Sequence, residues 1–262
     1  MASIRGPHDE SYEDFYSHWV DVQMQQLQEL RDALESDMRE QELRKLVDKV
    51  HAHYEYYYTC NDSAAKQNIL QMLSPSWRTS LEKAFMWIGG WRPTMFSQLA
   101  YALAGHHVEA ELAELLEGTD SPSMASLTGS QLESIDTLQR GALKDEERLS
   151  EKLAVLQQSM ADEPLISLVQ AEVNGLIRHG FGDGDGDGEV LMHEVVNEKL
   201  KVLENIFLDV NFLRVNALVG MLNILTTFQS AQYLMAMGQL QAAFRKMGGY
   251  DTVGKNQSAS TS

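Results

Sequence analysis

Apolar residues recur every three or four positions along nearly the whole chain, which is the spacing of one face of an α-helix. Phe15, Trp19 and Leu30 lie on one such face of a first helix, and residues 43–57 and 132–160 repeat the pattern. No run alternates between apolar and polar residues for long enough to predict a β-strand. The pattern therefore predicts an all-α fold, a multi-helix bundle of about 8–10 helices.

Two helix starts carry the polar residues of a capping box. Ser11 precedes the first apolar stripe, with Asp14 three residues later, and Thr128 and Gln131 stand in the same relation before a long helix. In this arrangement the first side chain accepts a hydrogen bond from the backbone N–H three residues on. The sequence therefore predicts that helices begin just after Ser11 and Thr128.

Breaks in the pattern predict further boundaries. Asp62 is placed to cap a short third helix, and Gly105 to interrupt the helix that follows Pro93. A Gly/Asp loop at 180–188 precedes two final helices, which are expected from about residue 191 onward. The predicted organisation is a flexible N-terminus at 1–10, one domain at 11–248 and a disordered tail at 249–262.

The charge of the chain limits its partners. Lys and Arg number 21 and Asp and Glu 38 among 262 residues, which gives a net charge of −17. Such a field repels phosphate groups, so no direct binding to nucleic acid is expected. No signal peptide and no run of 18 apolar residues is present, so no membrane span is predicted, and the single cysteine excludes an intramolecular disulfide. These features predict a protein of the nucleus and cytoplasm.

One local motif has the spacing of a metal site. Residues 183–194 fit the twelve-residue EF-hand pattern, in which carboxylates at alternate positions and a closing glutamate surround Ca²⁺ with oxygen atoms. The alternative is a flexible acidic linker between two helices, and no second EF-hand loop is present to pair with this one. The candidate calcium ligands are Asp183, Asp185, Asp187, Glu189 and Glu194.

Motifs that indicate catalysis are absent from the sequence. It contains no phosphate-binding loop, no HExxH pair, no nucleophile elbow and no zinc-ligand spacing. No catalytic residue is assigned, and a non-enzymatic function is expected.

Two separated segments resemble a known family. Residues 73–93 contain Trp77, Trp87 and Trp91 around a Gly-Gly pair, and residues 225–231 read Leu-Thr-Thr-Phe-Gln-Ser-Ala. Together with Phe15-x-x-x-Trp19 and Leu-Thr-Gly-Ser-Gln-Leu at 127–132, they resemble the plant Delay of Germination domain. That domain occurs alone in seed-dormancy proteins and also follows the basic zipper of TGA-type transcription factors. Each of the three tryptophans is expected to bury a large area.

The resemblance implies a regulatory function that depends on protein–protein interaction. Stand-alone members of the family act in seed dormancy and abscisic-acid signalling by restraining clade-A type-two-C protein phosphatases. A second interpretation is a transcriptional co-regulator that works through a DNA-bound TGA-type bZIP factor, and a third is a calcium-responsive module. The resemblance also leaves a homodimer open. The candidate partner contact is the aromatic set Tyr12, Phe15, Tyr16 and Trp19, which could instead seat the first helix on the core.

Two departures from the family bear on what can be carried over. The sequence has no basic region or leucine zipper before residue 11, so direct reading of the DNA major groove is not expected. Some dormancy proteins of the family bind haem through histidines of the last helix, where this chain has Gln241 and Arg245. An amide and a guanidinium cannot replace axial imidazoles, so haem is not an expected cofactor.

Overall fold

The computed structural model describes residues 11–36, 38–114, 124, 127–162, 165–167, 169–170 and 186–258. This part of the chain is all-α, as predicted, and contains no strand, only an isolated bridge between Trp87 and Gly90. Its elements are α1 Tyr12–Glu35, α2 Glu40–Leu73, α3 Ser80–Ala84, α4 Thr94–Glu114, α5 Gly129–Gln158, the 3₁₀ helix η2 Ser159–Ala161, α7 Gly186–Ile224 and α8 Thr227–Ser258.

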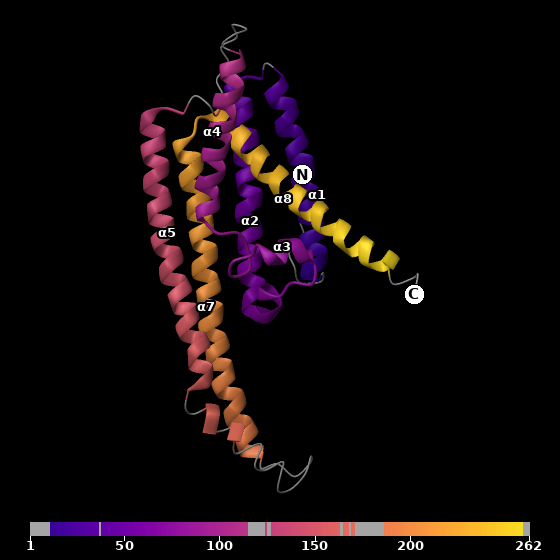
Figure 1. The fold of residues 1–262 in the computed structure, drawn as a ribbon, viewed down its shortest axis with the longest axis vertical. Coiled ribbons are helices and arrows are strands. Elements are labelled where there is room, and N and C mark those ends of the chain that lie inside the picture. The colour runs from indigo at the N-terminus through magenta and orange to yellow at the C-terminus, as the bar shows by residue number, and fades with distance from the viewer. Residues whose placement is uncertain are drawn as a thin grey trace.

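Helices α5 and α7 run side by side along the length of the molecule, and α2 packs against α7 (Figure 1). Helix α8 contacts both α1 and α2, and α4 contacts α5, α7 and α8. In Figure 1, α5 and α7 continue below the point at which α2 ends at Leu73. The lower part of the α5–α7 pair is therefore left without a helix from the N-terminal half on one side.

The apolar residues form two contiguous cores. The larger one joins α1, α2, α4, α7 and α8 around residues such as Leu30, Met221 and Leu234, which are fully or almost fully buried. The smaller one lies where the end of α2 meets α5 and α7, around Leu149 and Phe207. Because α7 contributes to both cores, it is the central helix of the fold.

Helix α7 is also long and apolar. Leu191–Ile224 is long and apolar enough to cross a membrane by length and composition, with a mean hydropathy of 1.3 in its most apolar window, of which 50% is buried. Charged residues such as Glu194, Lys199 and Asp209 interrupt this stretch, so it contains no unbroken run of 18 apolar residues. Its buried face carries Arg214 and Asn211 as well as apolar side chains, and it packs against α2 and α5. That packing accounts for its composition as the core helix of a bundle.

Helices begin after both Ser11 and Thr128, as predicted, and both side chains cap them. The Ser11 hydroxyl accepts a hydrogen bond from the Asp14 N–H at 3.2 Å, and the Thr128 hydroxyl accepts one from the Gln131 N–H at 3.2 Å. Reciprocal bonds complete the box at Thr128. A further box, not predicted, joins Thr79 to Glu82 at the start of α3.

Several predicted boundaries were wrong. Asp62 lies inside α2 and starts no helix; its carboxylate instead accepts a hydrogen bond from Asn211 Nδ2 of α7 at 2.7 Å. The break in α2 comes later, at Asn68, where φ is −154° and ψ is 87°. Gly105 lies within α4, since an isolated glycine weakens a helix by only about 1 kcal/mol.

The C-terminal half is more helical than the sequence pattern indicated. Helix α7 begins at Gly186, inside the predicted Gly/Asp loop at 180–188, and α8 extends to Ser258, past Gly249, where the predicted tail begins. The described residues contain seven α-helices, because predicted neighbours merge within α2 and α4, and residues 171–185 lie outside the described part. A compositional break is therefore a poor predictor of a helix end where the helix has tertiary support.

Candidate functional site

A tight turn at residues 87–91 joins α3 to α4. Trp87 and Gly90 exchange backbone hydrogen bonds, from the Trp87 N–H at 2.6 Å and from the Gly90 N–H at 3.3 Å. The two residues between them have positive φ, 45° at Ile88 and 79° at Gly89. Left-handed backbone is rare for a β-branched residue such as Ile88. Such a conformation persists only where surrounding contacts impose it.

The glycine pair lets this turn touch α7. A Cβ atom at Gly89 would lie 2.3 Å from the ring of Phe207, and one at Gly90 would lie 3.0 Å from the guanidinium carbon of Arg214. The first distance is a severe overlap, and the second is too short for ordinary contact. The Gly-Gly pair in the family-like segment therefore serves close approach to α7 as well as backbone conformation.

The guanidinium of Arg214 on α7 holds the turn through hydrogen bonds to its backbone carbonyls. Its side chain is only 1% exposed, and it donates from Nε to the Trp91 carbonyl at 2.8 Å, from Nη2 to the Trp87 and Ile88 carbonyls, the latter at 3.0 Å, and from Nη1 to Asn211 Oδ1 at 2.7 Å. Backbone carbonyls thus take the place of a carboxylate partner. Burial lowers the pKa of Arg214 to about 10, so the group is still charged at neutral pH.

The three tryptophans of this segment are partly buried, in keeping with the expectation that each buries a large area. Trp77, Trp87 and Trp91 are all partly exposed, whereas Trp19 of α1 is 4% exposed. The Trp87 ring lies between the core and solvent, where its Nε1 donates to Ser150 Oγ at 3.2 Å and the Arg92 guanidinium lies 5.3 Å from the ring centroid. Trp87 and Trp91 thus flank the turn, whereas the Trp77 ring packs against Tyr12 of α1, with 4.7 Å between ring centroids.

The candidate partner-contact residues of α1 lie in the core. Phe15, Tyr16 and Trp19 are 9%, 4% and 4% exposed, and only Tyr12 is partly accessible. The Trp19 ring stacks on His53 of α2 at 4.9 Å between centroids and an angle of 3°, and its Nε1 donates to the His53 carbonyl at 3.2 Å. The alternative interpretation, in which these aromatics seat the first helix, agrees with this packing. A partner could reach them only if α1 moved.

The buried carboxylate of Glu82 links α1, α3 and α8. Glu82 is 6% exposed and accepts hydrogen bonds from the Tyr16 hydroxyl at 3.3 Å and from Arg78 at 3.5 Å. Arg245 of α8 lies 3.8 Å from the same carboxylate and donates to the Tyr16 hydroxyl at 3.1 Å. Burial works against the charge on Arg78, but the neighbouring Tyr57 and Tyr16 hydroxyls and the Glu82 carboxylate raise its pKa overall. The cluster therefore ties α8 to α1 and α3.

The two positions aligned with haem-binding histidines are used for internal contacts. The Gln241 side-chain oxygen accepts hydrogen bonds from Gln23 Nε2 at 2.5 Å and from the Tyr54 hydroxyl at 3.1 Å. Arg245 joins the Glu82 cluster. In this chain both side chains connect α8 to the helices beneath it, which gives these positions a structural use.

The other family-like segments meet at the opposite end of the bundle. Gln131, which forms the capping box of α5 with Thr128, donates from Nε2 to the Ile224 carbonyl at 3.0 Å and to Gln229 Oε1 at 2.8 Å. Gln229 Oε1 also accepts from the Thr226 N–H at 3.0 Å. The segments at 127–132 and 225–231 are thus joined at the turn between α7 and α8.

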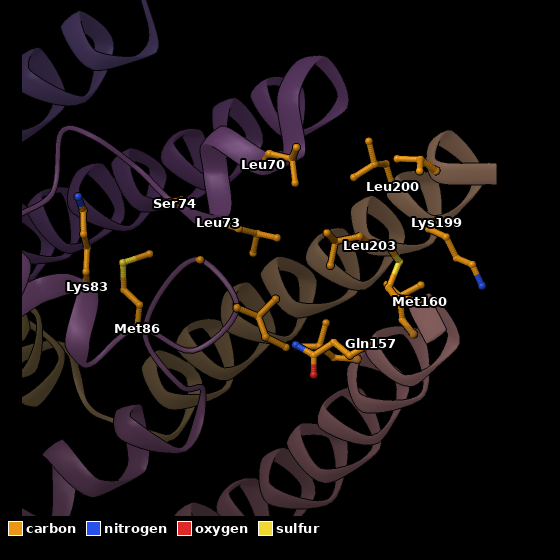
Figure 2. A pocket seen from close by; sticks show the side chains of 15 residues that line it. Leu70, Leu73, Ser74, Lys83, Met86, Gln157, Met160, Lys199, Leu200 and Leu203 are labelled. Carbon is orange, nitrogen blue, oxygen red and sulfur yellow. The ribbon is translucent and has the colours of Figure 1, made fainter. Parts of the chain in front are cut away.

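An apolar groove opens where α2 ends, and we call it the α2–α7 groove (Figure 2). It has a volume of about 540 Å³ and lies between the end of α2, the turn at 87–91, and the adjoining parts of α5, η2 and α7. Its walls are mostly aliphatic side chains and methionines, and a lysine stands at each side in Figure 2. Leu70, Leu73, Met160, Leu200, Lys83 and Lys199 are among the residues that form it.

The candidate calcium ligands are only partly within the described residues. Asp183 and Asp185 lie outside them. Asp187 and Glu189 fall in the first turns of α7, and Glu194 is an exposed residue further along that helix. No group of three or more His, Cys, Asp or Glu side chains that could hold a metal ion occurs among the residues described. Calcium binding by residues 183–194 stays a prediction.

Several residues that organise this region were not identified from the sequence. Arg214 is the one formal charge in the apolar stretch 210–225, a signal that could have marked it. Glu146 is 1% exposed and accepts a hydrogen bond from the Thr94 N–H at 2.7 Å, so it caps α4 from a distance. Glu82 carried only the local signal of its capping box with Thr79.

The structure is that of an all-α protein in which the family-like segments at 73–93 and 127–132 both bond to the central helix α7, at Arg214 and at Ile224. Residues 26–102 match the family model named DOG1, described as seed dormancy control. The resemblance to the Delay of Germination domain that the sequence predicted is thereby confirmed, because relatives along most of the chain include both a DOG1-like protein and TGA factors.

Three relatives illustrate the similarity. Transcription factor TGA2.3 of Oryza sativa subsp. japonica is 31% identical over 232 residues, which cover 88% of this chain and 62% of that protein. Transcription factor TGA7 of Arabidopsis thaliana is 33% identical over 229 residues, which cover 87% of this chain and 53% of that protein. Protein DOG1-like 3 of Arabidopsis thaliana is 25% identical over 242 residues, which cover 89% of this chain and 82% of that protein. The chain therefore spans about three fifths or less of the TGA factors that it matches.

Proposed function

We propose that this protein is a non-enzymatic regulator of seed dormancy and abscisic-acid signalling that acts by protein–protein interaction in the nucleus. Its target in this proposal is a clade-A type-two-C protein phosphatase, whose activity it restrains. The observation that carries the proposal is the match of residues 26–102 to the seed dormancy control family. The similarity to DOG1-like 3, which extends over 82% of that relative, supports it further.

The helical architecture is compatible with such a role. The polar residues of the fold are used largely to hold helices together, as in the contacts of Arg214 and of Glu82. The relatives reported above are named as transcription factors and as a DOG1-like protein. A scaffold fastened in this way presents fixed surfaces to a partner.

A phosphatase assay tests the proposal. Purified protein is titrated into a clade-A type-two-C phosphatase, and dephosphorylation of a phosphopeptide is followed with time. We expect activity to fall in proportion to the added protein and to level off near a one-to-one ratio. A type-two-C phosphatase from outside the abscisic-acid pathway serves as control. Unchanged clade-A activity at a large excess of the protein would reject phosphatase restraint.

A second candidate function is co-regulation of transcription with a TGA-type bZIP factor. The observation that favours it is the higher identity to TGA factors, 31% and 33%, than to DOG1-like 3, 25%. A mobility-shift experiment separates the two functions. A TGA factor bound to its duplex should be retarded further on addition of this protein, whereas the protein alone, at a net charge of −17, should leave the duplex unshifted.

A further inference from the structure

The α2–α7 groove exists because two helices have different lengths. The buried face of α7 that carries Phe207 continues through Leu203 and Leu200, three or four residues apart, toward the helix start. Helix α2, which covers this face higher in the molecule, ends at Leu73. The apolar face of α7 thus runs on beyond its cover (Figure 1), and the groove is the uncovered part.

The rim of the groove is apolar and accessible. Leu70 on the α2 side is 56% exposed, and Met160 on the η2 side is 45% exposed. Figure 2 shows both side chains at the edge of the space between the helices. An enclosed small-molecule site buries most of its ligand, whereas this surface extends outward onto its rim. Its form suits a ligand that lies across the surface and inserts several side chains.

The groove also departs from the rest of the chain in charge. Its lining includes Lys83 and Lys199 and no Asp or Glu, in a chain with 38 acidic and 21 basic residues. Lys199 donates to the neutral Ser159 hydroxyl at 2.7 Å. Neither lysine forms an ion pair with a carboxylate in the described part of the chain. Two cations without anionic partners beside an apolar surface select for an occupant that carries negative charge.

We propose that the α2–α7 groove binds a short amphipathic helix of a partner protein, apolar on one face and acidic toward both ends. Apolar side chains spaced three or four residues apart would enter between Leu73 and Leu200, as in helix-in-groove recognition. Acidic residues at either end would meet Lys83 and Lys199, which stand at opposite sides of the groove (Figure 2). This inference rests on the proposed function as an interaction module and names its surface and the chemistry of its partner.

Two synthetic peptides test the charge preference with the full chain. Both have the same length and the same apolar face, and one carries Glu at its ends where the other carries Lys. Fluorescence anisotropy measures the affinity of each at low and at moderate salt. We expect the acidic peptide to bind at least about tenfold more tightly at low salt, with a smaller difference as salt screens the lysines. Equal affinities, or no binding of either peptide, would overturn the inference.

Matched variants locate the binding surface. The double substitution Lys83→Glu and Lys199→Glu should reverse the preference between the peptides, and Leu200→Asp should weaken both. Lys201→Glu is the control, because this exposed residue of α7 makes the same charge change two positions away and does not line the groove. Circular dichroism confirms that each variant is folded. If Lys201→Glu acts as strongly as Lys199→Glu, the preference reflects overall charge and the assignment fails.

Two further measurements decide between occupants. Displacement of the acidic peptide by dodecanoate at concentrations far below the Kd of the peptide would assign the groove to a small carboxylate amphiphile instead. Self-association that is abolished by Leu200→Asp would assign it to a second copy of the chain. Either result overturns the inference. If the unmodified protein inhibits the phosphatase but binds neither peptide, the groove assignment alone is rejected. If it binds the acidic peptide with the expected charge dependence but does not inhibit the phosphatase, the proposed function alone is rejected.

Discussion

Replacing Arg214 by methionine tests the idea that this residue fastens the turn at 87–91. Methionine keeps an unbranched side chain of similar length but removes every donor. The carbonyls of Ile88 and Trp91 would then lose their hydrogen bonds inside the fold, while the Trp87 carbonyl would still accept from the Gly90 N–H at 3.3 Å. The substitution therefore removes four hydrogen bonds and leaves three acceptors without their donor, because Asn211 Oδ1 also loses the bond from Nη1.

The expected loss follows from these three acceptors. A buried acceptor that loses its donor costs about 1–3 kcal/mol. Three of them give roughly 3–9 kcal/mol, while removal of a buried charge recovers part of the cost. We expect a net decrease of about 3–5 kcal/mol in the free energy of unfolding, which is a large fraction of the roughly 5–15 kcal/mol typical of a protein domain.

Urea denaturation followed by circular dichroism measures this decrease, and a melting curve should show a lower Tm by roughly 6–20 °C. The control is Arg148→Met on α5, where the arginine forms an exposed pair with Asp145 at 3.1 Å. Its effect should stay within about 0.5 kcal/mol. A change of less than about 1 kcal/mol for Arg214→Met would refute the claim that carbonyl pairing by this guanidinium stabilises the turn.

Three further predictions address other features. Gly89→Ala adds a Cβ atom 2.3 Å from Phe207 at positive φ and should destabilise by roughly 2–5 kcal/mol in urea, whereas Gly141→Ala, which has open space, should not destabilise. Burial lowers the pKa of His53, so the unfolded chain binds a proton at this residue more readily than the folded chain does. The free energy of unfolding should therefore fall as the pH drops below about 6.5. Urea denaturation of His53→Gln at several pH values should show a weaker fall. Calorimetry with millimolar Ca²⁺ should give a Kd on the order of 10⁻⁵–10⁻³ M that Glu194→Gln abolishes, and absence of heat in the unmodified protein would leave residues 183–194 as a linker.

Features set by neighbouring residues could be read from the sequence. The helix caps at Ser11 and Thr128 need partners only three residues away, and both side chains accept the expected hydrogen bond. The helical periodicity likewise predicted the all-α fold. The same local logic failed at Asp62, because its carboxylate pairs with Asn211, 149 residues away, rather than with its own helix start. A polar residue at a plausible boundary is therefore ambiguous until the helix that faces it is known.

The arrangement around the turn could not be predicted, because its contacts are remote in sequence. Arg214 donates to backbone carbonyls 123–127 residues earlier, and a carbonyl has no signature in the amino-acid sequence. The same limit explains the aromatic set of α1. Its spacing indicated a shared face but did not distinguish a core face from a partner surface, and the stacking of Trp19 on His53 placed it in the core.

The turn at 87–91 links the stability of the fold to the shape of the α2–α7 groove. Ile88 and Gly89 line the groove, and the same residues are held from the other side by Arg214 and by close approach to Phe207. Any change that releases the turn will therefore alter one wall of the groove as well as the core beneath it. Conversely, a ligand in the groove binds the folded form and stabilises the turn by mass action. The strained backbone at Ile88, with φ of 45°, is thus packed against the core and borders the groove at once, so occupancy of the groove would reach α7 both directly, at Leu200 and Leu203, and through the turn that Arg214 holds.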